Sequence, residues 1–336
     1  MSTRAKQIIR LVTRISVAGF LLAWVFSQAD IAQFLQTVRT ARWEYLLGVW
    51  GFTAAFFWLQ SVALQWILRK QDCRVSTNTI FGASAVTSLY GLVLPGILST
   101  GIKWYILKRS TGKGSHVLSG MLYNQVTLTV VMTVIGLAGL IVTNPAQTLF
   151  PDGGPQHVLP LACAAAIVLV VLSSVLAVNK RTGGLILRLI AFALRPLPRT
   201  IREKGAALLA QIATFQTAGW RFHLAIAAIN VVDGLLIGLL IYLSAAWAAR
   251  VVVPTGVLIW LCAIVFVLGK IPISVANLGV REVTLVGLLA GYGVGRAEAL
   301  LMSMILFSSL IFMAAIGLVY WLVWAVQARK AGRPGD

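Results

Sequence analysis

The sequence has few charged residues and very few acidic ones. Of its 336 residues, 11% are charged, and only 9 are Asp or Glu against 28 Lys or Arg. Soluble domains carry about 25% charged residues. The low charge therefore excludes a soluble globular protein and a disordered chain. The excess of cations at first suggests nucleic acid, but their placement along the chain, given below, argues against such a partner.

Cysteine and histidine are also scarce. The three cysteines and three histidines show no metal-ligand spacing. His116, His157 and His223 stand at the edges of apolar segments, where polar residues of a membrane interface are common. Neither a Ser-His-Asp arrangement, nor H-E-x-x-H, nor a P-loop is present. We therefore expect no metal, no cofactor and no enzymatic activity.

Long hydrophobic runs make up most of the chain, and 59% of its residues are hydrophobic. A run of about 20 apolar residues crosses a bilayer core of roughly 30 Å. The runs do not alternate as the strands of a membrane barrel would. The first run also resembles a signal peptide, but its apolar character extends back to Ile8 and favours an uncleaved span. We expect an all-α polytopic membrane protein with six full spans, at 11–28, 45–68, 117–143, 158–178, 222–249 and 298–326.

Two further apolar stretches are shorter and end at prolines. The first, 79–94, runs into Pro95-Gly96 and is followed by a second short apolar piece. The second, 255–270, runs into Pro272, and Gly279 follows. Pro and Gly both interrupt a helix. The pattern predicts two Pro-broken re-entrant hairpins, within 79–114 and 255–296.

The placement of Lys and Arg predicts the orientation. If both broken segments return to the side they enter from, most of the 28 cations lie in the cytoplasm, and the cation-free stretch 144–157 lies outside. Both termini are then cytoplasmic, and the two hairpins have opposite orientations, as in an inverted repeat. We expect a single membrane domain, 1–336, in a bacterial-type inner membrane. Its halves, 1–178 and 222–327, flank a basic segment, 179–221, that forms either amphipathic surface helices or a plain linker.

Asp233 is the main candidate for chemistry in the second half. It lies inside the span 222–249, three residues after Asn230. A charged side chain at the centre of a span costs at least about 2.5–3.5 kcal/mol on insertion scales, so it should face the bundle interior or a water-filled cavity. It either serves transport as a charge partner or protonatable group, or forms a structural pair with a cation of a hairpin.

The second hairpin contains the most informative stretch. Ser274 and Asn277 lie between Pro272 and Gly279 and can satisfy backbone groups freed by the break. Arg281 and Glu282 then open the next helix. Arginine has a fork-shaped donor suited to phosphate. The alternative is an arginine–acid pair that holds the hairpin in place.

The first hairpin offers Lys103, eight residues after Pro95, where it corresponds to Arg281 of the second hairpin. Its ammonium group either reaches a phosphate or extends to the interface. Asn124 and Gln125, in the next span, could line the same cavity. If the halves are related by symmetry, Lys103 and Arg281 should approach one another near a shared cavity.

The motif from Ile271 to Glu282, with Gly293-Val-Gly downstream, resembles the lysylphosphatidylglycerol synthase transmembrane region family, also called flippase-like. The Leu94-Pro95-Gly96 turn resembles the family's first motif, and the resemblance spans about 10–327. This chain has Lys103 where the family usually has arginine, and Thr100 where an acid is frequent. Tyr123, Asn124 and Gln125 replace an acid–arginine pair. The synthase domain of multidomain members is absent from this sequence, so the resemblance does not imply aminoacyl transfer.

Three functions remain open from the sequence. The first is a lipid transporter that moves or binds an anionic phospholipid or polyprenyl-phosphate-type lipid, passively or coupled to an ion. Lys103 and Arg281 would contact the phosphate, with Asp233 and Glu282 as counter-charges. The second is a membrane-embedded transferase acting on a lipid-linked substrate. The third is an accessory scaffold that recruits a partner through 179–221. A homo-oligomer is compatible with each.

Overall fold

The computed structural model describes residues 31–92, 96–146, 157–179, 182–184, 213–270 and 279–330. All regular secondary structure in these ranges is helical. The elements are α2 (Ile31–Thr40), α3 (Tyr45–Arg69), α4 (Thr77–Gly91), α5 (Gly96–Thr111), α6 (Gly114–Thr143), α8 (Val158–Val178), η1 (Thr214–Thr217), α11 (Trp220–Val231), η2 (Val232–Ile237), α12 (Gly238–Ala248), α13 (Thr255–Leu268), α14 (Val280–Ala290) and α15 (Arg296–Lys330).

Five of these helices are long and apolar enough to cross a membrane. They are α3, α6, α8, the continuous rod Trp220–Ala248 formed by α11, η2 and α12, and α15. Their bounds agree with five predicted spans to within a few residues. The sixth predicted span, 11–28, lies outside the described residues, as does most of the predicted surface segment 179–221. The chain is an integral membrane protein.

Short helices occur where the sequence predicts broken segments. The first pair is α4 and α5, which pack against one another, and the second pair is α13 and α14. At 14 residues, α13 spans about 21 Å, which is less than a bilayer core. Gly279 has φ +84 immediately before α14, a conformation that suits glycine. The breaks themselves, with Pro95 and Pro272, lie outside the described residues.

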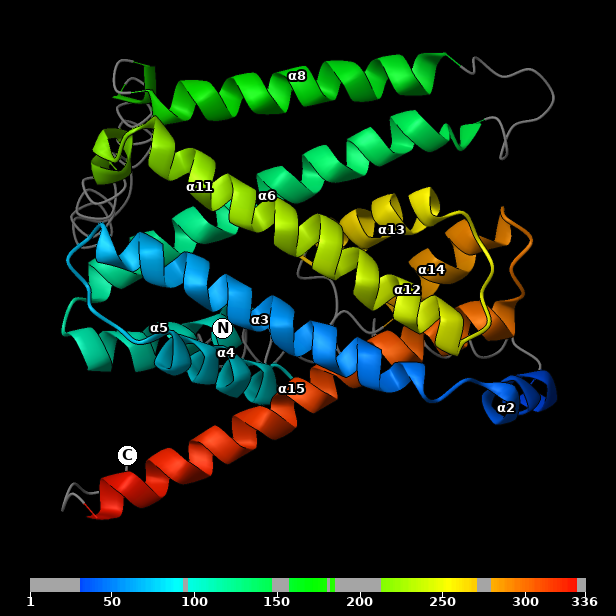
Figure 1. Ribbon diagram of the computed structural model, residues 1–336, viewed down its shortest axis with the longest axis horizontal. Coiled ribbons are helices and arrows are strands. Elements are labelled where there is room, and N and C mark those ends of the chain that lie inside the picture. The colour runs from blue at the N-terminus through cyan, green and yellow to red at the C-terminus, as the bar shows by residue number, and fades with distance from the viewer. Residues whose placement is uncertain are drawn as a thin grey trace, which may run out of the picture.

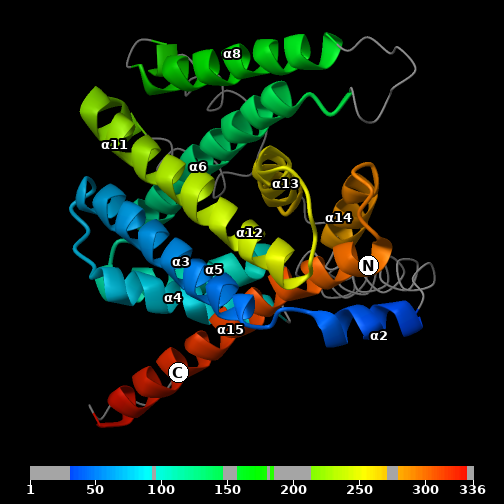
Figure 2. The same cartoon turned by 45° about the vertical axis from the view of Figure 1, so that its right-hand side comes forward.

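The long helices form a layered bundle. α3, α6 and the α11–α12 rod lie side by side, and α15 crosses behind α3 (Figures 1 and 2). The largest apolar core lies between α3, α6, α12, α13, α14 and α15. α8 stands at the edge of the bundle, packed mainly against α6. Most of its surface is exposed, as expected of a helix that faces lipid.

Small residues let neighbouring helices approach closely. A Cβ added to Gly317 on α15 would collide with the backbone of Ala85 on α4. A Cβ added to Gly136 on α6 would lie 2.7 Å from the Ala263 side chain on α13. Such contacts bring backbones together in a lipid environment, where van der Waals packing drives association.

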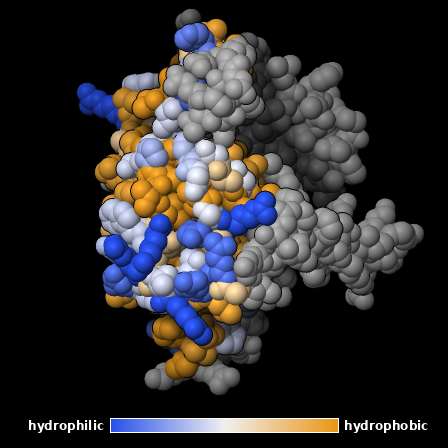
Figure 3. Space-filling view, turned by 90° about the vertical axis from the view of Figure 1, so that its right-hand side faces the viewer, coloured by the Kyte–Doolittle hydropathy of each residue, from blue (hydrophilic) through white to orange (hydrophobic). Residues whose placement is uncertain are grey.

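One end of the bundle is hydrophilic. Figure 3 shows the end of the bundle where α2 joins α3 and where a loop follows α12. In the coloured part of this face, hydrophilic residues spread across the middle and hydrophobic residues surround them. Arg42, Arg250 and Arg296 are exposed in the described segments near these helix ends. This distribution fits an aqueous boundary of the membrane.

Candidate functional site

Four polar side chains form a buried cluster where α3, α6 and the α11–α12 rod meet. Gln60 Nε2 donates hydrogen bonds to Asp233 Oδ2 at 2.6 Å and to Asn230 Oδ1 at 2.9 Å. Asn124 Nδ2 donates to Gln60 Oε1 at 3.0 Å. Asp233 and Asn230 are completely buried, and Gln60 and Asn124 are each 9% exposed. Gln60 therefore connects three of the residues predicted from the sequence.

Asp233 is stabilised by amides rather than by a cation. Within the described part of the chain it forms no ion pair, and its Oδ1 has no hydrogen-bond partner. The pairing with a hairpin cation, one of the two readings of the sequence, is therefore not seen there. Oδ1 of Asn124 and Nδ2 of Asn230 are also buried without a partner. The cluster consequently retains hydrogen-bonding capacity that the described residues do not use.

The helix that carries Asp233 widens at this point. Residues Val232–Ile237 form a π-helical segment, and the N–H of Gly238 bonds to the carbonyl of Asp233. Gly234 fits against Met132 of α6, where a Cβ would collide with the methionine sulfur. Single π-turns inside α-helices occur frequently at functional sites. Here the wider turn coincides with the only acid in the middle of a described spanning helix.

A cavity of about 410 Å³ lies next to this cluster, between α3, α4, α5, α6 and the end of α13. Lys103 of α5 and Lys270, just after α13, both line it, and we call it the dibasic cavity. Among the described residues that line it there is no Asp or Glu. Its other polar lining residues carry hydroxyl or amide groups: Gln60, Ser84, Thr87, Ser88, Ser99, Thr100, Asn124 and Gln125.

The charge of the dibasic cavity favours an anion. Two ammonium groups without an acid in the described lining attract negative charge. The attraction is stronger at Lys103, which is partly buried, than at Lys270, which is exposed. Lys270 Nζ lies 4.2 Å from the centre of the Phe266 ring. Hydroxyl and amide groups around the lysines can donate hydrogen bonds to phosphate oxygens. Gln60 belongs both to this lining and to the Asp233 cluster.

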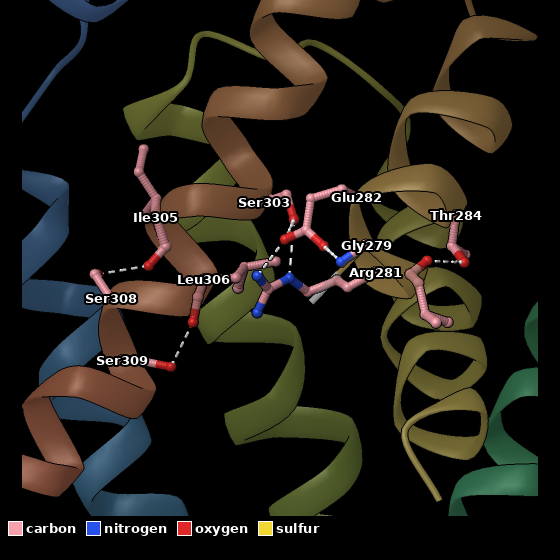
Figure 4. A network of polar contacts seen from close by, with 10 residues as sticks. Gly279, Arg281, Glu282, Thr284, Ser303, Ile305, Leu306, Ser308 and Ser309 are labelled. Atoms are coloured by element: carbon pink, nitrogen blue, oxygen red, sulfur yellow. Dashed lines mark hydrogen bonds and ion pairs between the residues drawn. The ribbon is translucent and has the colours of Figure 1, made fainter. Parts of the chain in front are cut away.

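Arg281 and Glu282 form a separate network, shown in Figure 4. Arg281 Nη2 donates to Glu282 Oε1 at 2.5 Å, and Arg281 Nε donates to Ser303 Oγ of α15 at 2.8 Å. Ser303 Oγ donates to Glu282 Oε1 at 3.0 Å, and the Gly279 N–H bonds to Glu282 Oε2 at 2.6 Å. Glu282 therefore caps the start of α14 while its ion pair with Arg281 joins α14 to α15.

This geometry corresponds to the structural alternative for Arg281. The guanidinium stacks over the Phe307 ring at 5.3 Å, and Arg281 is not among the residues that line the dibasic cavity. Leu310, one helical turn after Phe307, does line the cavity. Phe307, over which Arg281 stacks, therefore lies about one turn of α15 from the cavity, and Ser303 lies about two turns from it.

The predicted residues fall into three groups. Lys103, Asn124 and Gln125 share the dibasic cavity, while Asn230 and Asp233 lie behind Gln60. Arg281 and Glu282 pair with each other. Of the predicted break residues, Gly96 begins α5 and Gly279 precedes α14, whereas Pro95 and Pro272 lie outside the described residues. The predicted lipid-binding residues Ser274 and Asn277 also lie outside them.

The sequence did not lead us to predict Gln60, Lys270 or the hydroxyl-bearing face of α4 as site residues. Ser84, Ser88 and Gly91 recur on one face of α4 at helical spacing, and all three line the dibasic cavity. This stripe of small and polar residues in an apolar segment was a usable signal. Gln60 is a lone amide in an apolar run, and its sequence neighbours give no indication of its partners.

Comparison with known proteins gives one match. The model of the family described as "Lysylphosphatidylglycerol synthase TM region" matches residues 11–325. No curated protein and no solved structure matches the chain.

Proposed function

The chain belongs to the lysylphosphatidylglycerol synthase TM region family, and from this membership and the dibasic cavity we propose that it binds an anionic, phosphate-bearing lipid headgroup within the membrane and moves it between leaflets. The observation that carries the proposal is the pair Lys103 and Lys270 in one cavity with no acid in its described lining. The transported lipid remains covalently unchanged.

Membrane-facing residues at the rim support entry of a lipid. Leu118 and Leu122 of α6 line the dibasic cavity and are 37% and 40% exposed. The surface around α6 lies in the membrane, so a headgroup can enter between helices while its acyl chains stay in the bilayer. The two lysines then replace part of the hydration that the phosphate loses.

The two broken helix pairs support an inverted-repeat transporter. The pair α4 and α5 supplies Lys103. In the pair α13 and α14, Lys270 lies just after α13, where the break begins. In transporters of this architecture, broken helices of opposite orientation place the site near the midplane. We place the site between these two pairs, with Lys270 in the role that the sequence assigned to Arg281.

The distribution of described cations supports the proposed orientation. Arg69, Lys70, Lys108, Arg109 and Arg221 lie at the ends of α3 and α5 and at the start of α11, and these helix ends gather at the left of Figure 1. By the positive-inside rule this end faces the cytoplasm. We therefore propose an inner-membrane protein in which both halves form one domain. The chain carries no nucleotide-binding motif, so we propose passive or ion-coupled movement.

The test is a leaflet-exchange assay on the full chain, reconstituted in vesicles containing fluorescent phosphatidylglycerol. Lys103→Gln and Lys270→Gln each remove one charge from the dibasic cavity, and we expect each to slow exchange at least tenfold. The matched control is Lys108→Gln, on the same helix as Lys103 but exposed and stacked over Trp104 at 5.0 Å. It should exchange lipid at the parent rate.

Two outcomes would contradict the proposal. Equal rates for all three variants would show that the cavity lysines do not contact the transported headgroup. A change in lipid mass during the assay would favour a transferase instead. Thermal unfolding of each variant distinguishes a lost contact from a lost fold.

A further inference from the structure

A second cavity lies on another face of α6. It is a slot of about 320 Å³ between α6, α8 and α11. Val126 and Val130 of α6, Val175 and Val178 of α8, and Leu224 and Ala227 of α11 form its walls. Leu122 is the one residue that lines both this slot and the dibasic cavity in the described structure. We call the space between α6, α8 and α11 the α8 slot.

The α8 slot has a polar mouth. A neighbouring cavity of about 620 Å³ shares Val175, Val178, Gln216, Trp220 and His223 with the slot. It adds polar residues at the end of α8 and before α11, namely Asn179 and Thr217. The slot therefore passes directly from apolar walls to hydrogen-bonding groups at its mouth.

His223 marks the boundary between the two regions. It lines both cavities and is 8% exposed. Its Nδ1 is hydrogen-bonded to the Tyr123 hydroxyl at 2.5 Å. Its Nε2 is buried and has no partner within hydrogen-bonding geometry in the described residues, while the Phe215 backbone interacts with the ring more weakly. When the Tyr123 hydroxyl donates to Nδ1, Nε2 carries the proton and can donate to a ligand oxygen.

The mouth is also electropositive. The mouth cavity is lined by Gly219 and Trp220, and α11 begins at Trp220, so the positive end of the helix dipole lies there. Lys70 Nζ lies 5.7 Å from the centre of the Phe222 ring in the first turn of α11. An anionic or oxygen-rich group is favoured at this position.

We propose that the α8 slot binds a lipid of its own, distinct from the one in the dibasic cavity. One hydrocarbon chain lies between α6, α8 and α11, and an anionic polar group with oxygen acceptors lies at His223 and the start of α11. All three helices that line the slot belong to membrane-spanning helices, so hydrocarbon surrounds it.

This lipid would join α8 to the bundle. Among described elements, α8 packs chiefly on α6, with a small contact to η1. The proposed chain fills the space between α8 and α11 and adds a second apolar contact at the last turn of α8, from Ser174 to Val178. The inference does not depend on transport by the dibasic cavity.

The test uses the full chain in nanodiscs of phosphatidylglycerol with a photoactivatable diazirine in one acyl chain. Cross-linked peptides are mapped by mass spectrometry, and lipid retained after extraction is counted by native mass spectrometry. Val126→Trp and Val175→Trp fill the α8 slot from opposite walls. Their matched controls are Val142→Trp and Val168→Trp, on the same helices, 83% and 65% exposed and outside the slot.

We expect cross-links in the parent to concentrate on the slot segments of α6, α8 and α11. Each slot-filling variant should reduce them at least fivefold and lose one retained lipid, while both controls stay within twofold of the parent. Equal labelling of the Val126→Trp and Val142→Trp variants would overturn the proposal and show annular lipid only. Using two slot variants keeps the test valid if one of them fails to fold.

A third arm distinguishes one lipid from two. The double variant Lys103→Gln/Lys270→Gln should leave labelling of the slot unchanged. If it abolishes that labelling, a single lipid occupies both regions and the separate site is wrong. Failure of leaflet exchange in the parent would instead contradict the proposed function and leave the slot result standing.

Discussion

Gln60 joins the two polar regions inside the bundle. Its side chain lines the dibasic cavity and donates to both Asn230 and Asp233. A headgroup that draws the Gln60 amide toward itself removes the hydrogen-bond donor of a buried carboxyl, which is unfavourable. Anion binding and the interactions of Asp233 are therefore expected to be coupled.

The role of the Asp233 carboxyl can be tested by comparing two substitutions. Asp233→Ala removes one of the two acceptors of the buried Gln60 amide and leaves only Asn230 Oδ1, a loss of about 1–3 kcal/mol. Asp233→Asn keeps an oxygen acceptor, so we expect it to unfold closer to the parent temperature. Both should lose lipid exchange, because neither can carry the negative charge. If Asp233→Asn exchanges lipid at the parent rate, Asp233 is a structural residue.

The Arg281–Glu282 pair is expected to hold α14 against α15. Glu282→Ala leaves Arg281 buried without its acid, and breaking a buried pair destabilises by about 3–5 kcal/mol. Ser303→Ala removes only a hydroxyl from the same network and should lose about 1 kcal/mol. Thermal unfolding in detergent measures both changes. Parent-like unfolding of Glu282→Ala would mean that the pair does not stabilise the fold.

At the scale of helices, close packing of α4 and α15 depends on Gly317. Gly317→Ala places a methyl group against the Ala85 backbone and should force the helices apart, lowering the unfolding temperature. Gly51→Ala is the matched control, since a Cβ there meets nothing within 4 Å. Alanine favours a helix over glycine by about 1 kcal/mol, so Gly51→Ala should be neutral or stabilising. Equal destabilisation by both would contradict the packing argument.

The sequence predicts the helices well because their causes are local. Hydrophobic length sets the spans, and Pro95, Pro272 and Gly279 mark the breaks. Contacts between helices are not local: Gln60 meets Asp233 across 173 positions, and nothing in either segment shows which faces meet. Symmetry suggested Arg281 as the partner of Lys103, but adjacent Glu282 and Ser303 of α15 bind Arg281. Lys270 lines the cavity with Lys103.

For the whole molecule, the orientation in the membrane can be measured by cysteine labelling. Glu44 and Ser110 are exposed at opposite ends of the bundle, and we expect an impermeant maleimide on intact cells to label Glu44→Cys but not Ser110→Cys. The native cysteines are buried, and burial raises the pKa of the Cys73 thiol, so little reactive thiolate forms near neutral pH. The reverse labelling pattern would invert the proposed topology.

We expect the π-helical segment at Asp233 to let this helix accommodate a one-residue deletion. A one-residue deletion in an ordinary α-helix turns every later side chain by about 100°. The wide turn at Val232–Ile237 already holds one residue more than an α-turn. Deleting Leu236, which is 55% exposed, would let the rod close into a regular α-helix while α11 and α12 keep their faces. The Leu236 deletion variant should fold but hold Asp233 at a different angle to Gln60. Deletion of Ile259 within α13, an ordinary α-helix, should instead prevent folding.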